Sequence, residues 1–174
     1  MHGAFVVGLN ELVVNKYGKD IWLEILESAG FDANYRPLSN LEVNDNEAVL
    51  LVKAATKKLN LGDKVFGEVF GNYWIKYFAK EKYFAFLDAF KNVKEFLKQI
   101  NEIHRKLTAN LKNHKPPFFE FQWESPQIVI ISYHSQRQLI HIAVGTLNAL
   151  GEYYRDDIAV YKIEANKIKV IFSY

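Results

Sequence analysis

The chain of 174 residues contains no cysteine. Disulfides, thiolate zinc sites and thiol-based redox sensing are therefore excluded, and the absence fits a reducing compartment. Long apolar runs are absent too, so we expect no membrane-spanning helix and no membrane partner. At the start of the chain there is no basic segment, and Asn10 and Glu11 interrupt the apolar residues, which is unlike a signal peptide. Together these absences predict a cytoplasmic protein.

An excess of either charge is also missing. The 22 Lys and Arg residues are balanced by 20 Asp and Glu residues, which leaves a net charge of +2. Because the basic residues form no cluster, a nucleic-acid partner is not expected. We find no internal repeat and no low-complexity segment, so residues 1–174 are expected to form a single domain.

Aromatic residues, by contrast, are abundant, with 13 Phe, 10 Tyr and 3 Trp. Such side chains suit a large apolar interior, and they equally suit a pocket for a flat ligand. A chain of this length can form a sizeable core around such a pocket.

The spacing of apolar residues divides the chain into two parts. Up to about residue 114 the spacing is helical, and it predicts helices over residues 4–16, 20–30, 45–59, 64–79, 82–90 and 93–111, with Asp20 as the cap of the second. Lys115-Pro116-Pro117 ends this region, because proline lacks the backbone N–H and restricts the residue before it. Alternating residues then predict strands over 119–124, 127–134, 158–164 and 167–174, with a helix over 138–154 between the second and third. We therefore expect an α+β fold: a helical first two-thirds, then a four-stranded antiparallel sheet with one inserted long helix.

His104 lies on the apolar face of the helix predicted over residues 93–111. That face carries apolar residues at helical spacing: Val93, Phe96, Leu97, Ile100, Ile103, Leu107 and Leu111. A buried imidazole needs partners for its ring nitrogens. From this helix alone two interpretations are open, namely a core histidine bonded to a backbone carbonyl, or a ligand to a metal or to haem iron.

Two glycines, Gly67 and Gly71, lie four residues apart in the aromatic-rich helix predicted over residues 64–79. Because glycine destabilises a helix by roughly 1 kcal/mol relative to alanine, the pair indicates close approach by another group. That group is either a second helix or the edge of a planar ligand.

Tyr133, Ser135 and Arg137 stand between the second predicted strand and the following helix. In one interpretation Ser135 is an ordinary N-cap and Arg137 a surface residue of the first turn. In the other, the three side chains converge on carboxylates, since a guanidinium can bind a carboxylate through two bonds and hydroxyls donate single ones. The N-terminus of the helix would add its own affinity for anions.

In combination, these features resemble the H-NOX family of haem-binding nitric oxide and oxygen sensors. The resemblance rests on the apolar helix with His104, the Pro-Pro pair and the Tyr-x-Ser-x-Arg spacing of residues 133–137, and it extends to Met1-x-Gly3, Tyr17-Gly18 and Ala29-Gly30. It covers nearly the whole chain. It implies one haem b (protohaem IX) per chain, buried between the helical part and the sheet part.

The resemblance also implies roles for individual residues. His104 matches the axial ligand of the haem iron, and we expect its second ring nitrogen to be held by a backbone carbonyl or by Asn101. Tyr133, Ser135 and Arg137 match the motif that binds the haem propionates, and Pro117 matches the proline that packs on the haem. The other positions expected in the haem pocket are Phe5, Leu9, Gly71, Trp74, Ile75, Phe78 and Ile142.

Oxygen-binding members of the family carry a tyrosine that donates a hydrogen bond to dioxygen, supported by an asparagine and a tryptophan. The matching positions here are Ile142, Trp74 and Leu9 respectively. The missing tyrosine implies nitric oxide binding with poor or no stable oxygen binding, because nitric oxide binds ferrous haem tightly without a donor. Two other donors stay open as alternatives, the Trp74 indole N–H and the Thr146 hydroxyl.

The function implied by the resemblance is a bacterial sensor of nitric oxide, which would also bind carbon monoxide, without enzymatic activity of its own. Because a chain of this length has no room for an output enzyme, the signal is expected to pass to a separate histidine kinase or cyclic-di-GMP enzyme. Two alternatives stay open. A haem enzyme that detoxifies nitric oxide or peroxide would need a distal acid–base pair, which we do not find. A haem-free module for an apolar ligand or a protein would need His104 to be a core residue.

Overall fold

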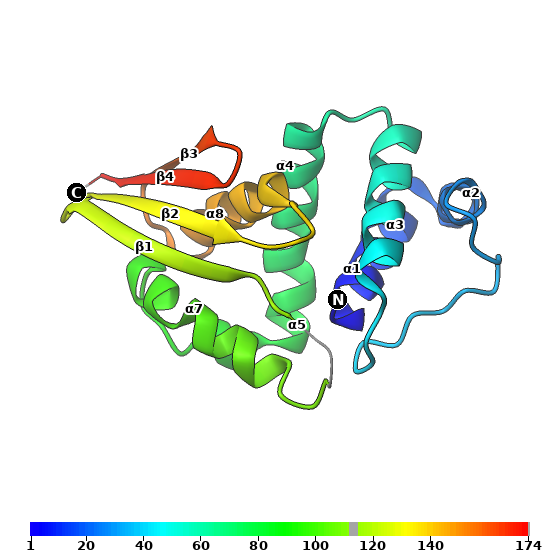
Figure 1. Ribbon diagram of the computed structural model, residues 1–174, viewed down its shortest axis with the longest axis horizontal. Helices are drawn as coiled ribbons and strands as arrows, with labels where there is room; N and C mark the ends of the chain where they lie inside the picture. Colours follow the sequence, from blue (N-terminus) through cyan, green and yellow to red (C-terminus); the bar gives the residue numbers. More distant parts are fainter. Residues whose placement is uncertain (112–114, 174) are drawn as a thin grey trace.

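The computed structural model describes residues 1–111 and 115–173 of the chain. Within them the elements follow in the order α1 (Gly3–Tyr17), α2 (Lys19–Ser28), α3 (Asp45–Lys58), α4 (Asp63–Tyr73), η1 (Trp74–Ala79), α5 (Lys80–Lys82), α6 (Phe84–Leu87), α7 (Val93–Leu107), β1 (Phe118–Ser125), β2 (Ile128–His134), α8 (Ile140–Tyr154), β3 (Ile158–Glu164) and β4 (Lys167–Phe172). A helical part therefore precedes a sheet into which α8 is inserted (Figure 1). The α+β fold expected from the sequence is confirmed.

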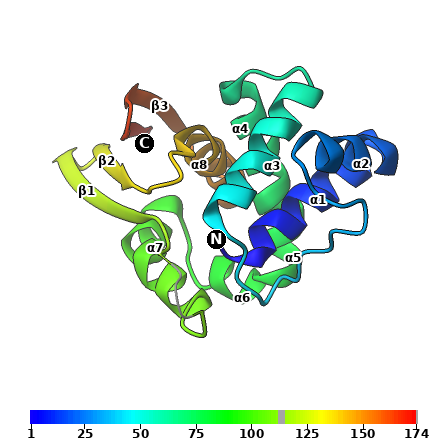
Figure 2. The same cartoon turned by 45° about the vertical axis from the view of Figure 1, so that its right-hand side comes forward.

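The sheet has four antiparallel strands in the order β1-β2-β4-β3. β4 pairs with both β2 and β3, although it comes last in the chain. Alternation along β2 places Val129, Ile131 and Tyr133 on its buried face. α7 lies beside β1, and α8 lies between the sheet and α4 (Figures 1 and 2). α7, which carries His104, and α8, which carries Ile142, therefore both lie next to the sheet.

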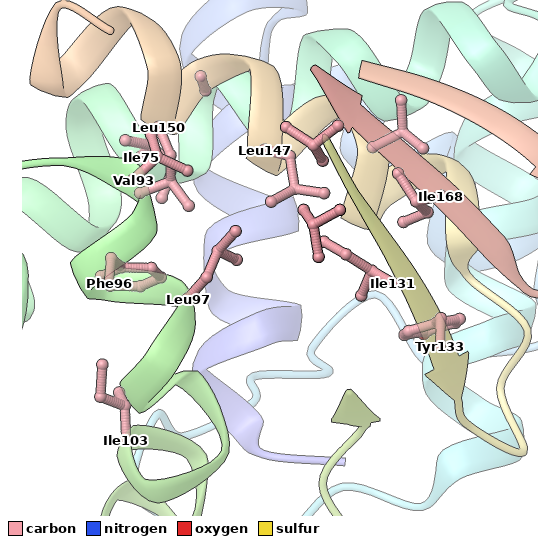
Figure 3. Close-up of a cluster of buried hydrophobic side chains, with 14 of the residues drawn as sticks. Ile75, Val93, Phe96, Leu97, Ile103, Ile131, Tyr133, Leu147, Leu150 and Ile168 are labelled. Atoms are coloured by element: carbon pink, nitrogen blue, oxygen red, sulfur yellow. The ribbon is translucent and has the colours of Figure 1, made fainter. Parts of the chain in front are cut away.

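Two clusters of buried apolar side chains form the interior. One lies between α7, α8 and the sheet, and Figure 3 shows Leu97, Ile131 and Leu147 pointing toward one another from these three elements. The other cluster lies among α1, α2, α3 and α4. Ile142 of α8 belongs to this second cluster, whereas Leu147 belongs to the first, so α8 connects the two.

Several boundaries in the helical part differ from the prediction. α2 begins at Lys19, directly after Gly18 with its φ of 95°, so Asp20 lies in the first turn and is not the cap. The helix predicted over residues 64–79 changes to a π-helix from Trp74 to Ala79. The helix predicted over 82–90 is reduced to α6, because the backbone breaks at Tyr83 with a φ of −131°.

Two further boundaries lie close to the residues of the expected haem site. α7 ends at Leu107 and not at residue 111, because the backbone of Thr108 leaves the helical conformation with a φ of −111°. α8 begins only at Ile140, since Gln138 has a left-handed φ of 53°. Ser135 therefore lies in the loop and is not an N-cap.

Candidate functional site

A cavity of about 250 Å³ lies inside the protein, lined by residues of both core clusters. Its walls come from the start of α1, from η1, α7, β2 and α8, and from the segment between α7 and β1. Most of the wall is apolar. The polar or amphipathic side chains on it are His2, Trp74, Tyr83, His104, Thr108, Tyr133, Arg137 and Thr146. A cavity of this character suits a flat apolar ligand with a few polar attachment points.

His104 faces this cavity from the last turns of α7. Its Nδ1 lies 3.3 Å from the Pro117 carbonyl oxygen, and because a carbonyl only accepts, Nδ1 carries the proton. No described residue forms a hydrogen bond with Nε2. Burial lowers the pKa of His104 to about 4, against which the bond to Pro117 acts only partly. The imidazole is therefore neutral near pH 7, with one ring nitrogen held and the other available to a ligand in the cavity.

Asn101 does not hold His104 but fixes the segment that does. Its amide donates to the Phe119 carbonyl at 2.7 Å and accepts from the Phe119 N–H at 3.0 Å. This pair of bonds joins α7 to β1 one turn before His104. Of the two partners expected for the second ring nitrogen, the structure therefore selects the backbone carbonyl, from Pro117.

Tyr133, Ser135 and Arg137 converge at one end of the cavity. Burial raises the pKa of the Tyr133 hydroxyl, although Ser135, Arg137 and the backbone of Leu139 act in the opposite direction. The Arg137 N–H donates to the Ser135 oxygen at 3.3 Å. Tyr133 and Arg137 both line the cavity, whereas Ser135 stands behind them and contacts both.

The Arg137 guanidinium is buried, and an internal carboxylate neutralises it. Its Nη1 lies 3.0 and 2.9 Å from the two oxygens of Asp45, and its Nη2 donates to the Lys115 carbonyl at 2.9 Å. The amino group of Met1 bonds to Asp45 as well, and it donates to the Val43 carbonyl at 2.7 Å. Arg137 thereby joins the sheet part to the start of α3 and to the N-terminal residue.

The opposite wall of the cavity consists of apolar and aromatic side chains. Phe5, Trp74, Ile75 and Ile142 line it. The Thr146 hydroxyl donates to the Ile142 carbonyl at 2.8 Å, so its proton is already used within α8. The Trp74 indole N–H bonds to no described residue, and the ring stacks on Phe78 at a centroid distance of 4.7 Å.

A family model for haem-NO-binding proteins (HNOB) matches residues 2–162 of the chain. The chain belongs to the H-NOX family. This family comprises haem-based gas-sensor domains related to soluble guanylate cyclases.

Known proteins similar to this H-NOX chain agree with that assignment. The soluble guanylate cyclases gcy-34 and gcy-32 of Caenorhabditis elegans are 24% and 23% identical to it over 159 residues, or 87% of the chain. The chain spans about a quarter of the length of these relatives, since the matches cover 23% of each. No helix within residues 1–111 and 115–173 is long and apolar enough to cross a bilayer.

Solved H-NOX structures share the fold over the whole chain. A Cs H-NOX mutant carrying 4-cyano-L-phenylalanine at site 5 superposes with a TM-score of 0.85 at 20% identity, covering 100% of this chain and 97% of that one. An H-NOX protein from S. oneidensis in the Fe(II) ligation state gives 0.87 at 18% identity, again over 100% and 97%. An oxygen-binding H-NOX domain gives 0.83 at 19% identity, over 100% and 96%.

The structure brings most of the residues expected in the haem pocket to one cavity. His104, Pro117, Tyr133 and Arg137 line it, as do Phe5, Trp74, Ile75 and Ile142. Leu9 and Phe78 lie behind this lining in the structure: Leu9 is fully buried in the helical core, and Phe78 packs on Trp74.

We expected Gly71 to line the haem pocket, but the structure places it elsewhere. It is not part of the cavity wall, and a Cβ at this position would lie 2.2 Å from the backbone of Gly145. The close approach signalled by Gly67 and Gly71 is therefore that of α8, and the interpretation as a ligand edge was wrong.

Sequence reasoning missed two residues of the site, Asp45 and His2. Asp45 was read only as the start of a helix, yet it pairs with Arg137 across 92 residues of chain. His2 lines the cavity together with residues of α7. No local pattern marks such residues, because their partners are brought to them by the fold.

Proposed function

We propose that this H-NOX chain is a haem-based sensor of nitric oxide that binds the gas at ferrous haem iron, with poor or no stable oxygen binding. One haem b per chain, bound in the cavity between the two core clusters, would also bind carbon monoxide. The observation that carries the proposal is the pairing of a buried neutral imidazole, whose Nε2 has no bond to a described residue, with an apolar wall formed by Ile142, Ile75 and Phe5.

The residues present fit a haem. His104 would supply the nitrogen ligand to the haem iron, and the Pro117 carbonyl orients its ring through Nδ1. Tyr133 and Arg137 would supply a hydroxyl and a guanidinium for the propionates from the cavity wall, with the Ser135 hydroxyl behind them, and Pro117 also lines the cavity where it can pack on the ring. Phe5 and Trp74 provide apolar surface for the macrocycle.

A haem held by His104 would supply a ferrous iron that binds a diatomic gas, and gas binding would weaken the bond that His104 makes. The selectivity between nitric oxide and oxygen then depends on the side chains that the gas contacts in the cavity. Ile142 places an aliphatic side chain on the wall where a hydroxyl donor would hold oxygen, and Thr146 donates within its own helix. A hydroxyl donor would compensate the partial negative charge of an oxygen ligand, whereas nitric oxide would not require it. The Trp74 indole N–H, which bonds to no described residue, stays a donor on this wall.

For signalling we propose that release of His104 shifts the helical part relative to the sheet part, which a separate partner protein reads. The family resemblance favours a histidine kinase or a cyclic-di-GMP enzyme of a bacterial cytoplasm as this partner. We propose no enzymatic activity for the domain itself, since the described lining of the cavity contains no Asp or Glu that could form a distal acid–base pair.

The absorption spectrum of the purified ferrous protein tests the proposal. We expect a Soret band, a five-coordinate nitrosyl spectrum under nitric oxide, and no stable oxygen complex under air. His104→Gly should lose the histidine-ligated spectrum and regain it with added imidazole. A protein without haem, or one in which His104→Gly leaves the spectrum unchanged, contradicts the proposal. Rapid steady-state turnover of peroxide would favour the enzyme alternative.

A further inference from the structure

Asn101 pairs with the backbone of Phe119 through both polar atoms of its side chain. Its Nδ2 donates to the Phe119 carbonyl at 2.7 Å, and its Oδ1 accepts from the Phe119 N–H at 3.0 Å. Phe119 is the second residue of β1, whereas Asn101 lies on α7 about one helical turn before His104. We call this pair of bonds between α7 and β1 the Asn101–Phe119 clasp.

The clasp occupies the open edge of the sheet, because β1 is an edge strand beside β2. On β2, the Tyr133 N–H donates to the Asn166 carbonyl at 2.8 Å, and thus toward β4. Antiparallel strands alternate between residue pairs that exchange hydrogen bonds and pairs that do not, so Tyr133 and its partner Phe119 form a pair that does not. The N–H and the carbonyl of Phe119 therefore point away from β2, and the Asn101 carboxamide binds them as the backbone of a further strand would.

The clasp also fixes the segment that orients His104. Pro117, whose carbonyl accepts from His104 Nδ1, lies two residues before Phe119. The distance of 3.3 Å between Nδ1 and this carbonyl oxygen is long for a hydrogen bond, whereas the clasp has distances of 2.7 and 3.0 Å. The clasp therefore contributes more than the bond to Pro117 to holding this segment against α7.

The Phe119 side chain extends the clasp to the polar end of the cavity. Its ring lines the cavity and lies beside the rings of His104 and Tyr133, at centroid distances of 5.8 and 5.5 Å. A displacement of α7 that Asn101 passes to Phe119 thus reaches Tyr133 on β2 as well.

We propose that Asn101 is a positioning residue for His104: through the clasp it keeps α7 in place against residues 117–119, and so maintains the bond from His104 Nδ1 that orients the ring toward the haem iron. The part that concerns iron rests on the proposed function, whereas the clasp does not. Because a hydrogen bond from Nδ1 makes the imidazole a stronger ligand, loss of the clasp should weaken the bond between His104 and the iron.

Two substitutions at Asn101 and one control isolate the clasp. Asn101→Leu removes both bonds at a similar side-chain volume. Asn101→Asp keeps an oxygen that accepts from the Phe119 N–H but loses the donor to the Phe119 carbonyl. Gln99→Leu is the matched control, since it makes the same change from an amide to leucine at an exposed position of α7.

Two measurements on these proteins test the proposal. In the protein as purified, amide hydrogen exchange of Phe119 should be about fivefold faster in Asn101→Leu, the factor that corresponds to about 1 kcal/mol for a net hydrogen bond, and faster by a smaller factor in Asn101→Asp. The amide of Val170, on the inner strand β4, should keep its wild-type rate. In the ferrous haem protein, the iron–histidine stretching frequency measured by resonance Raman should be lower in Asn101→Leu, lower by a smaller amount in Asn101→Asp, and unchanged in Gln99→Leu.

Each result decides a different part of the proposal. Wild-type exchange of Phe119 in Asn101→Leu would overturn the clasp, and faster exchange with an unchanged stretching frequency would overturn the positioning role. If Asn101→Leu does not fold, the same criteria apply to Asn101→Asp. A wild-type protein that takes up no haem would contradict the proposed function, while the exchange comparison would still decide whether Asn101 holds β1.

Discussion

At the scale of single residues, the Arg137 side chain defines the polar end of the cavity. It is only 4% exposed, so its charge requires a partner, and Asp45 provides one at 2.9 Å. Burial alone would raise the pKa of Asp45, but the Met1 ammonium and Arg137 outweigh it and hold the pKa below its usual value. Asp45 therefore stabilises the folded chain as a carboxylate.

Asp45→Asn should lower the free energy of unfolding at pH 7 by about 1–2 kcal/mol, less than for a fully buried pair because Asp45 is 36% exposed. The folded pKa is depressed, so this contribution is complete above the unfolded pKa of about 3.9 and is lost as the pH falls through the folded value. Urea unfolding of both proteins at pH 7 and near pH 3 checks this. A difference that persists undiminished at the lower pH would contradict it.

Ile142 is the residue that the proposed gas selectivity depends on. Ile142→Tyr places a hydroxyl donor on the wall of the cavity and should produce a measurable oxygen complex in air, seen as a shifted Soret band in the ferrous protein. Ile142→Phe adds the ring without the hydroxyl and serves as the control. If both variants bind oxygen equally, cavity shape and not hydrogen bonding governs selectivity.

At the scale of elements, the crossing of α4 and α8 brings two backbones into direct contact. A Cβ at Gly145 would lie 1.9 Å from the Gly67 carbonyl oxygen, and one at Gly71 would lie 2.2 Å from the Gly145 carbonyl carbon. This close crossing places Ile142 on the cavity wall, because α8 can approach α4 only where neither helix carries side chains.

Gly71→Ala should therefore destabilise the protein by about 1–3 kcal/mol through overpacking, although alanine favours the helix by about 1 kcal/mol. Gly62→Ala is the matched control, since Gly62 precedes α4 with a φ of −70° and a Cβ there meets nothing within 4 Å. Denaturant midpoints of the two variants provide the comparison. Equal midpoints would contradict this, because they would show that α4 and α8 can move apart at the crossing without loss of stability.

At the scale of the whole molecule, the cavity is lined by residues of both core clusters, which α8 connects. A ligand in this cavity contacts both cores at once and should stabilise the fold by mass action. Haem at a hundredfold excess over its dissociation constant corresponds to about 2.7 kcal/mol, which for a chain of this size raises Tm by about 5–10 °C.

Thermal unfolding with haem, with metal-free protoporphyrin and without ligand measures this stabilisation. The porphyrin keeps the apolar surface and the propionates but cannot bond to His104, so its effect should be smaller than that of haem. In His104→Gly the two ligands should become equivalent. A Tm that does not respond to haem would contradict a binding site between the two cores.

Local patterns in the sequence predicted the elements well and the site in part. Helical and alternating spacing, with the Pro116-Pro117 break, predicted the helical part and the sheet, because burial of one face depends on residues close in sequence. The motif with Tyr133, Ser135 and Arg137 gave a candidate polar cluster for the same reason. No such local pattern in the sequence indicated the π-helix at Trp74 or the early end of α7.

Only the tertiary structure decided the contacts between segments that lie far apart in the sequence. Asp45 meets Arg137 and Gly71 meets Gly145, although 74 or more residues separate the members of each pair. Amino-acid type and spacing determined that His104 would lie on a buried face. Which nitrogen faces the cavity, and which carbonyl holds the other, depended on the packing of α7 against Pro117, because a hydrogen bond requires a geometry that no single segment specifies.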